Sequence, residues 1–379
     1  TNAGRNNRLV APGLEAAGQA TDQSPDLQGE LYSFTASSPD LQDDVYMIPD
    51  ALGLQRVNYI GAFEQDTDDN WTRDWTVQVN GNFTVWQPAS SGTLAGSAPA
   101  ADGTCPAGTT DEGDQALPAG MSGEMDLCRL AGSYETDGET ITLTNDNIYL
   151  LGSGFPGTMV GNDDAADGDS ANDVNVTLAI EPGTLILGSV QEALVVTRGS
   201  QIQAIGTAAD PIVMSSRDQF NGWVNGTNGD SGRSEWAGLA LMGYGPSNEC
   251  NTPCDVNAEG NVGAYGGTNP EDNSGELQYV VIAHAGNDID GNGNELNGLT
   301  FFGTGSATQA SYIQVHKGSD DGLEFFGSTT FVDHIVVTST TDDSFDWGQG
   351  WTGGAQFVLL MQPPDDAEPV RVRDSTDEV

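Results

Sequence analysis

The chain has 379 residues, of which 37% are hydrophobic and 50 are glycine, and it carries 56 acidic side chains against 11 basic ones. Its formal net charge of −45 at pH 7 excludes nucleic acid and anionic membranes as natural partners, because their phosphates would repel it. No run of 18 apolar residues occurs, so no transmembrane segment is predicted.

Residues 1–127 are predicted to form an N-terminal arm with a few short strands and a disulfide-tied loop. Residues 1–50 are polar and show no sustained period, which indicates an irregular arm. Aromatic and β-branched residues return between residues 57 and 86, where Asn80-Gly81 is typical of a hairpin turn. Residues 88–127 have almost nothing to bury and are predicted to be a loop.

The four cysteines fall into two local groups. An even number in local groups favours two disulfides in an exported protein. A zinc site is the alternative, but neither group has a histidine nearby. The two expected pairs are Cys105 with Cys128, and Cys250 with Cys254.

Residues 128–379 are predicted to be an all-β domain, a right-handed parallel β-helix solenoid. Gly298-Leu-Thr-Phe-Phe-Gly303 returns 24 residues later as Gly322-Leu-Glu-Phe-Phe-Gly327, and 22 residues after that, loosened, as Ser344-Phe-Asp-Trp-Gly348. A fixed period of this size, with turns rich in Gly, Asp and Thr, requires a coiled parallel sheet in which each repeat is one rung. Two long polar stretches, 217–235 and 244–274, are predicted to be loop insertions.

The repeat also predicts which side chains stack from rung to rung. Residues two apart on a strand point to the same face, so Phe301, Phe325 and Trp347 should form an internal column. The second repeated strand is expected to give two more columns. They are Val281, Ile313, Ile335 and Val358, and Ala283, Val315, Val337 and Leu360.

Two aspartate pairs, at 320–321 and 342–343, are candidate cation ligands. They are 22 residues apart and should occupy the same turn of neighbouring rungs, about 4.8 Å from each other. Two unit charges at that distance repel by about 3.5 kcal/mol at an effective dielectric of 20. Bound Ca²⁺, hydrogen bonds from turn amides or raised pKa values must offset this repulsion. Solvated turn aspartates and a catalytic carboxylate pair are the alternatives. The residues are Asp320, Asp321, Asp342 and Asp343.

A second candidate cation site lies at residues 287–295, which resemble the opening of a calcium loop. Oxygen donors recur at alternate positions, and a glycine stands where a sharp turn is needed. The glutamate that usually closes such a loop is missing, because Leu299 occupies the twelfth position, so an ordinary polar loop is the alternative. The candidate ligands are Asp288, Asp290, Asn292 and Glu295. A third, weaker candidate is the acidic run at residues 162–173.

Motifs over residues 128–362 resemble those of a widespread group of secreted bacterial proteins. They are Cys128-Arg-Leu, Ile180-Glu-Pro-Gly-Thr, Val196-Thr-Arg-Gly-Ser, Trp236-Ala-Gly-Leu, Tyr265-Gly-Gly, Asn294-Glu-Leu-Asn-Gly-Leu-Thr, Asp320-Asp-Gly-Leu-Glu-Phe-Phe-Gly and Asp342-Asp-Ser-Phe-Asp. The resemblance implies a right-handed parallel β-helix of the pectate-lyase-like type and export, and it implies no established activity.

The sequence therefore predicts an extracellular or cell-surface protein with a structural, adhesive or binding role, stabilised by divalent cations. Its partners would be further copies, joined end to end into filaments through an open rung, or an extracellular glycan or surface. The alternative is a polysaccharide hydrolase or lyase on the same scaffold. A lyase needs a basic residue, and Lys317 is the only Lys or Arg between Gly275 and Met361.

Overall fold

The computed structural model describes residues 101–162, 173–226, 232–251, 254–289 and 295–362. Shorter pieces are described at 55, 62, 71–72 and 75–77, and the backbone alone at 34–35, 59–60 and 372–374. The predicted hairpin at Asn80-Gly81, and the predicted arm apart from residues 34–35, lie outside the described residues.

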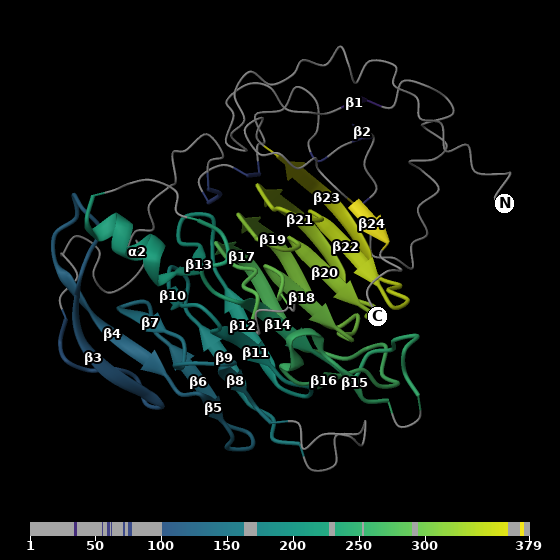
Figure 1. Ribbon diagram of the computed structural model, residues 1–379, viewed down its shortest axis with the longest axis horizontal. Helices are drawn as coiled ribbons and strands as arrows, with labels where there is room; N and C mark the ends of the chain where they lie inside the picture. The colour runs from purple at the N-terminus through teal and green to yellow at the C-terminus, as the bar shows by residue number, and fades with distance from the viewer. Residues whose placement is uncertain are drawn as a thin grey trace, which may run out of the picture.

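The longer of two main sheets has twelve strands, stacked side by side along the molecule (Figure 1). Its main path runs through β3 (Thr109–Ala116), β4 (Glu124–Leu130), β7 (Asn147–Leu150), β10 (Leu185–Gly188), β13 (Ile212–Ser216), β17 (Gly275–Ala283), β19 (Gln309–His316), β21 (Phe331–Thr338) and β23 (Gly354–Met361). Off this path lie β6 (Thr140–Leu143), β9 (Thr177–Ile180) and β12 (Gln201–Ile205).

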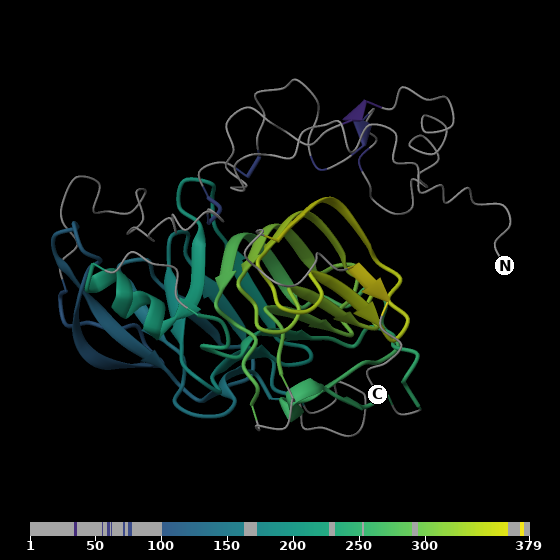
Figure 2. The same ribbon diagram turned by 45° about the horizontal axis from the view of Figure 1, so that its top comes forward.

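The second sheet has eight strands, all paired in parallel. They are β5 (Ser133–Tyr134), β8 (Gly157–Val160), β11 (Ala193–Val196), β14 (Gly238–Met242), β18 (Leu299–Phe302), β20 (Leu323–Phe326), β22 (Phe345–Gly348) and β24 (Val372–Asp374). The chain passes from one sheet to the other and back, so successive rungs stack as coils (Figure 2). The predicted parallel β-helix is confirmed.

The remaining elements are short. Two antiparallel pairs join β1 (Phe34–Thr35) to β2 (Tyr59–Ile60), and β15 (Val256–Asn257) to β16 (Ala264–Tyr265). The helices are α2 (Arg217–Val224) and the 3-10 helix η2 (Glu259–Asn261). Among the described residues no helix is long and apolar enough to cross a membrane.

The internal aromatic column lies where the repeat predicts it. Phe301 pairs in register with Phe325, and Phe325 with Trp347. The rings of Phe301 and Phe325 are stacked, with centroids 4.8 Å apart and planes 5° from parallel. Both are fully buried, while Trp347 packs against the core half-buried. Like side chains from successive rungs therefore build one continuous core.

The columns predicted on the second repeated strand were wrong by one residue in β17. Ile313 pairs with Val280, not Val281, and Val315 pairs with Ile282, not Ala283. The cause is Tyr279, whose positive φ of 49° turns the strand at a corner of the coil and shifts the alternation by one position. The corrected columns are Val280, Ile313, Ile335 and Val358, and Ile282, Val315, Val337 and Leu360.

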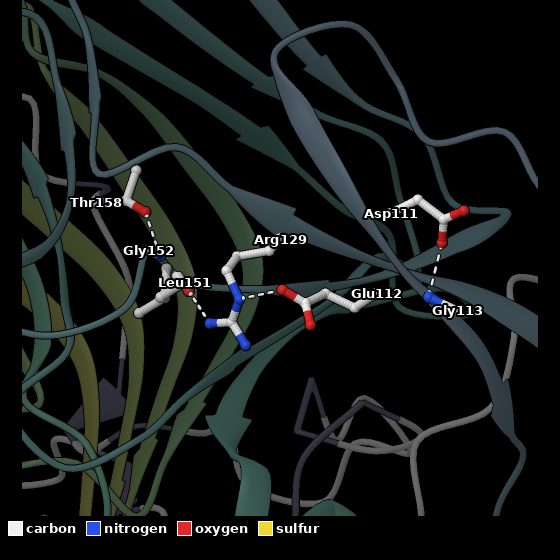
Figure 3. Close-up of polar contacts among 7 residues, drawn as sticks. All are labelled: Asp111, Glu112, Gly113, Arg129, Leu151, Gly152 and Thr158. Atoms are coloured by element: carbon white, nitrogen blue, oxygen red, sulfur yellow. Dashed lines mark hydrogen bonds and ion pairs between the residues drawn. The ribbon is translucent and has the colours of Figure 1, made fainter.

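The first rung is covered by β3, the one antiparallel strand in the main path. Residues 109–116 were expected to lie in a loop, and that expectation was wrong. Arg129 fixes the strand to the coil, because its Nε contacts Glu112 at 2.7 Å and its Nη1 donates to the carbonyl of Leu151 at 2.9 Å (Figure 3). The disulfide between Cys105 and Cys128 closes the same end.

Residues 217–224, expected within an irregular insertion, instead form α2. The Ser216 hydroxyl caps its N-terminus by accepting the backbone N–H of Gln219 at 2.9 Å, and Phe220 and Trp223 are buried. The insertion that begins at residue 244 carries the second disulfide, between Cys250 and Cys254. Both expected disulfides are therefore present.

Candidate cation site

Turn residues that precede β18, β20 and β22 form a ladder across three rungs. The backbone N–H of Asp321 donates to Oδ1 of Asn297 at 3.1 Å, and that of Asp343 donates to Oδ1 of Asp321 at 2.8 Å. Asp321 and Asp343 are buried, whereas Asp320 and Asp342 beside them are half-buried. The two aspartate pairs thus occupy equivalent turns of neighbouring rungs.

Two further acids join this ladder from the strands that follow it. Glu324 on β20 pairs in register with Asp346 on β22, and both are buried. Carboxylate oxygens of Asp321, Glu324 and Asp346 lie within 4.8 Å of one another. We call these three residues the buried carboxylate group. A second set, Asp320, Asp321 and Asp342, satisfies the same distance limit at the half-buried edge of the turn.

The sequence reasoning missed Glu324 and Asp346, although a signal was available. The second position of the repeated strand is Thr300 in the first copy and an acid in the next two. A charged residue inside an otherwise apolar strand is almost never fully buried unless it is paired or binds a metal. That signal could have marked both positions.

The electrostatics of the group are those of a site that needs neutralising. Burial, reinforced by the charges of Asp320, Asp346 and Asp343, raises the pKa of Asp321 to about 10. Asn297 reduces the cost of burial because its amide donates to Glu324 and, at 3.3 Å, to Glu259. At neutral pH the Asp321 carboxyl therefore holds a proton or needs a cation close by.

The predicted calcium loop reaches the same region through its ends. Asp288 and Glu295 form an isolated antiparallel bridge. Burial, and then the charges of Asp288 and Asp342, raise the pKa of Glu295 above its usual range. Asp290 and Asn292 lie outside the described residues, as do Asp163, Asp164, Asp167 and Asp169 of the weaker acidic run. The structure thus joins the first two candidate sites at Asp342.

The ligand set is made of oxygen only, which suits hard cations. Ca²⁺ takes six to eight oxygens at about 2.3–2.6 Å, and carboxylates within 4.8 Å of one another can meet around one such ion. Such an ion requires the ionised carboxylates, so it would displace the proton that Asp321 otherwise holds. The arrangement can therefore exchange protons for a divalent cation.

The fold and the buried acids define a parallel β-helix with a carboxylate ladder along one turn. A family model described as a pectate-lyase like beta helix domain matches residues 165–377, which is 377 − 165 + 1 = 213 of the 379 residues. The chain belongs to this family, and the ladder lies inside the matched range. No curated protein and no solved structure matches the chain.

Proposed function

We propose that this chain is an extracellular structural or binding protein whose solenoid is stabilised by a divalent cation, with Ca²⁺ the expected ion. The observation that supports this is the buried carboxylate group. Asp321, Glu324 and Asp346 are at most 4% exposed and their oxygens lie within 4.8 Å of one another. Like charges removed from water at that distance need protons or a cation to offset their repulsion.

The extracellular part of the proposal is supported by the covalent structure and the charge. Two disulfides join all four cysteines, and disulfides persist in oxidising compartments. A net charge of −45 destabilises a compact chain through self-repulsion unless salt or multivalent cations screen it. Seawater-like or calcium-rich surroundings would supply both.

Activity on polysaccharides has less support. Asp343 and Asp346 are 0% exposed, so a sugar chain cannot contact their carboxylates. A lyase also needs a base and positive charge for an acidic sugar, and the repeats supply one lysine. A role in scaffolding or binding makes no such demands. The edge of β23, which ends the longer sheet among the described residues, offers a place for end-to-end assembly.

Thermal melting with Ca²⁺, Mg²⁺ or a chelator tests the cation site directly. Ca²⁺ at 100 times its Kd should stabilise the fold by about 2.7 kcal/mol, a rise of several degrees in Tm. Mg²⁺ should do much less, because it keeps its waters and demands octahedral geometry.

The test variant is the double substitution Glu324→Gln with Asp346→Asn, and Glu271→Gln at an exposed position is its control. The double variant should lose the Ca²⁺ shift and the calorimetric heat of binding, while the control should keep both. Absence of any Ca²⁺ shift or binding heat for the unaltered chain at millimolar Ca²⁺ would reject the proposal.

A further inference from the structure

The outer face of the longer sheet carries a ladder of aromatic rings, one from each of four neighbouring strands. Successive centroids are 4.4, 4.3 and 4.6 Å apart, and the first two pairs are stacked within 17° of parallel. We call this set the aromatic ladder. Its members, from β17 to β23, are Tyr279, Tyr312, His334 and Phe357.

The corner of the coil explains why these rings face outward. All four residues have a positive φ, between 49° and 56°, and all are skipped in the pairing between strands. Each therefore stands at the bend instead of pointing into the core, and the spacing of about 4.8 Å between strands suits stacked rings. The sequence places an aromatic residue at the same strained position in four consecutive rungs.

A segment from far away in the sequence lies on this ladder. The edge of Trp71 meets the His334 ring at 5.0 Å and 86°, and Trp75 meets the Tyr279 ring at 5.6 Å and 89°. Both also make edge contacts with Tyr312. Trp75 is 4% exposed. We call residues 71–77 the tryptophan segment, of which 71–72 and 75–77 are described.

The sheet also pairs with the backbone of this segment through a glutamine side chain. The backbone N–H of Val77 donates to Oε1 of Gln314 at 2.6 Å, and Nε2 of Gln314 donates back to the Val77 carbonyl at 3.3 Å. Gln356 pairs in the same reciprocal way with the backbone of Gln55, at 2.7 and 2.8 Å. Each amide reproduces the two bonds that a neighbouring strand would make. These bonds hold the backbone, whereas the two indole rings supply the specificity.

We propose that the aromatic ladder and Gln314 form a docking surface for the tryptophan segment, and that the partner which uses it is a second copy of this chain. Every copy carries one segment and one surface, so two copies are complementary by construction. The contacts join residues 237 positions apart and involve none of the strands at the β3 end, so docking does not depend on which chain supplies the segment.

The length of chain beside the segment permits this exchange. Residues 78–100, 23 in number, separate Val77 from Ala101 at the covered end of the coil. At about 3.3 Å per residue they can span up to about 75 Å. From the β4 end to β19, five strand spacings of about 4.8 Å amount to about 24 Å. The reach therefore exceeds the distance to the chain's own surface and extends to a neighbouring molecule.

Mixing two full-length variants isolates docking between chains. The donor-defective variant, Trp71→Ala with Trp75→Ala, keeps its docking surface. The surface-defective variant, Tyr312→Ala with Gln314→Ala, keeps its segment. Neither can close on itself, so the mixture should form a 1:1 complex while each variant alone stays at monomer mass. Analytical ultracentrifugation at about 100 µM of each chain, well below the millimolar effective concentration of a tethered segment, measures this.

The conditions and controls follow from the charge and the core. Each copy carries −45, so about 0.5 M NaCl is used to shorten the Debye length to about 4 Å. Circular dichroism and melting confirm that each variant folds. If the surface-defective variant does not fold, Gln314→Glu replaces it, because the carboxylate keeps the acceptor for Val77 but loses the donor. Ile205→Ala, at an exposed apolar position on β12, should leave the complex unchanged.

Introducing Trp71→Ala and Trp75→Ala into both partners should weaken the complex at least tenfold. Two results would overturn the proposal. One is the absence of a 1:1 complex although both variants fold. The other is a dimer that each variant forms equally well alone, which would place association on another surface such as the β23 edge. Both results leave the Ca²⁺ test above unaffected, so the two proposals can fail separately.

Discussion

Oδ1 of Asp321 accepts the backbone N–H of Asp343, one rung further along the coil, at 2.8 Å. The same carboxyl group, 4% exposed, lies among other acids that raise its pKa to about 10. One oxygen thus continues the hydrogen-bond ladder between rungs, while the charge of the group opposes folding. This conflict makes Asp321 the most sensitive reporter of how the ladder is neutralised.

Asp321→Asn should have opposite effects with and without Ca²⁺. In chelator the folded carboxyl is protonated and the unfolded one ionises near pH 3.8, so the native residue loses stability as pH rises from about 4 to about 10, by at most about 1.4 kcal/mol per unit. Asparagine keeps the acceptor for Asp343 and has no charge. The variant should therefore be the more stable chain in chelator at pH 8.

With Ca²⁺ the order should reverse, because the native chain gains binding energy that the variant lacks. Urea unfolding at pH 5 and pH 8, in each condition, measures both effects. Glu135→Gln, at an exposed position, should show neither. A variant that is less stable than the native chain in chelator at pH 8 would mean that the Asp321 carboxyl is not protonated there.

Asp272 should make stability depend on pH between about 4 and 6. Burial raises its pKa to about 6 from the ordinary 3.8, and the Ser274 hydroxyl donates to it at 3.3 Å. The folded state holds this proton more tightly than the unfolded state, so its contribution is complete below pH 3.8 and is lost as pH rises through 6. The total is at most about 3 kcal/mol.

Asp272→Asn should remove this dependence. The difference in unfolding free energy between variant and native chain should grow in favour of the variant from pH 4 to pH 7 and then level off. Measuring both chains in chelator keeps the cation site out of the comparison. A difference that stays constant across this range would contradict the raised pKa.

Phe325→Ala should destabilise the coil by about 3–5 kcal/mol, because it leaves a cavity inside a continuous column. Its ring stacks on Phe301 at 4.8 Å and on Trp351 at 4.6 Å, and it is fully buried. Phe155→Ala provides the control, since Phe155 is 48% exposed and should change stability by less than about 1 kcal/mol. Urea unfolding of both variants measures the difference. Equal effects would contradict the stacked core.

The sequence predicted the column of Phe301, Phe325 and Trp347 because the strand repeat there is short, keeps strict alternation and is bounded by glycine or serine. It failed on β17 because the alternation breaks at Tyr279, and a bend in left-handed conformation has no residue signature when the residue is not glycine. The match between His284 and His316 reinforced the wrong register. Tyr279 and Tyr312 were the true equivalents.

The other misses have physical causes too. β3 pairs by its backbone and is mostly exposed, so its residues show no apolar alternation. The docking of Trp71 and Trp75 on strands more than 200 residues away is tertiary information that no local pattern contains. Glu324 and Asp346 were visible as acids within apolar strands. Only the observed pairing of strands shows that they meet Asp321.

Arg198 should hold the insertion at residues 244–274 against the coil. Its side chain is fully buried; Nη1 donates to the carbonyls of Cys254 and Gly266 at 3.2 and 3.1 Å, and Nη2 contacts Asp255 at 2.9 Å. Arg198→Met keeps most of the packing but leaves these acceptors without their donor. We expect a loss of about 2–4 kcal/mol.

The loss should fall on the insertion before it reaches the rungs, because the arginine contacts the coil only at its own position and the insertion through three groups. Hydrogen exchange should therefore rise first in β15 and β16, while the amides of β18 and β20 stay protected. Arg129→Met serves as the control, since its ion pair with Glu112 is part-exposed and is expected to contribute less than about 1 kcal/mol. Uniform loss of protection across insertion and rungs would show instead that Arg198 stabilises the whole coil.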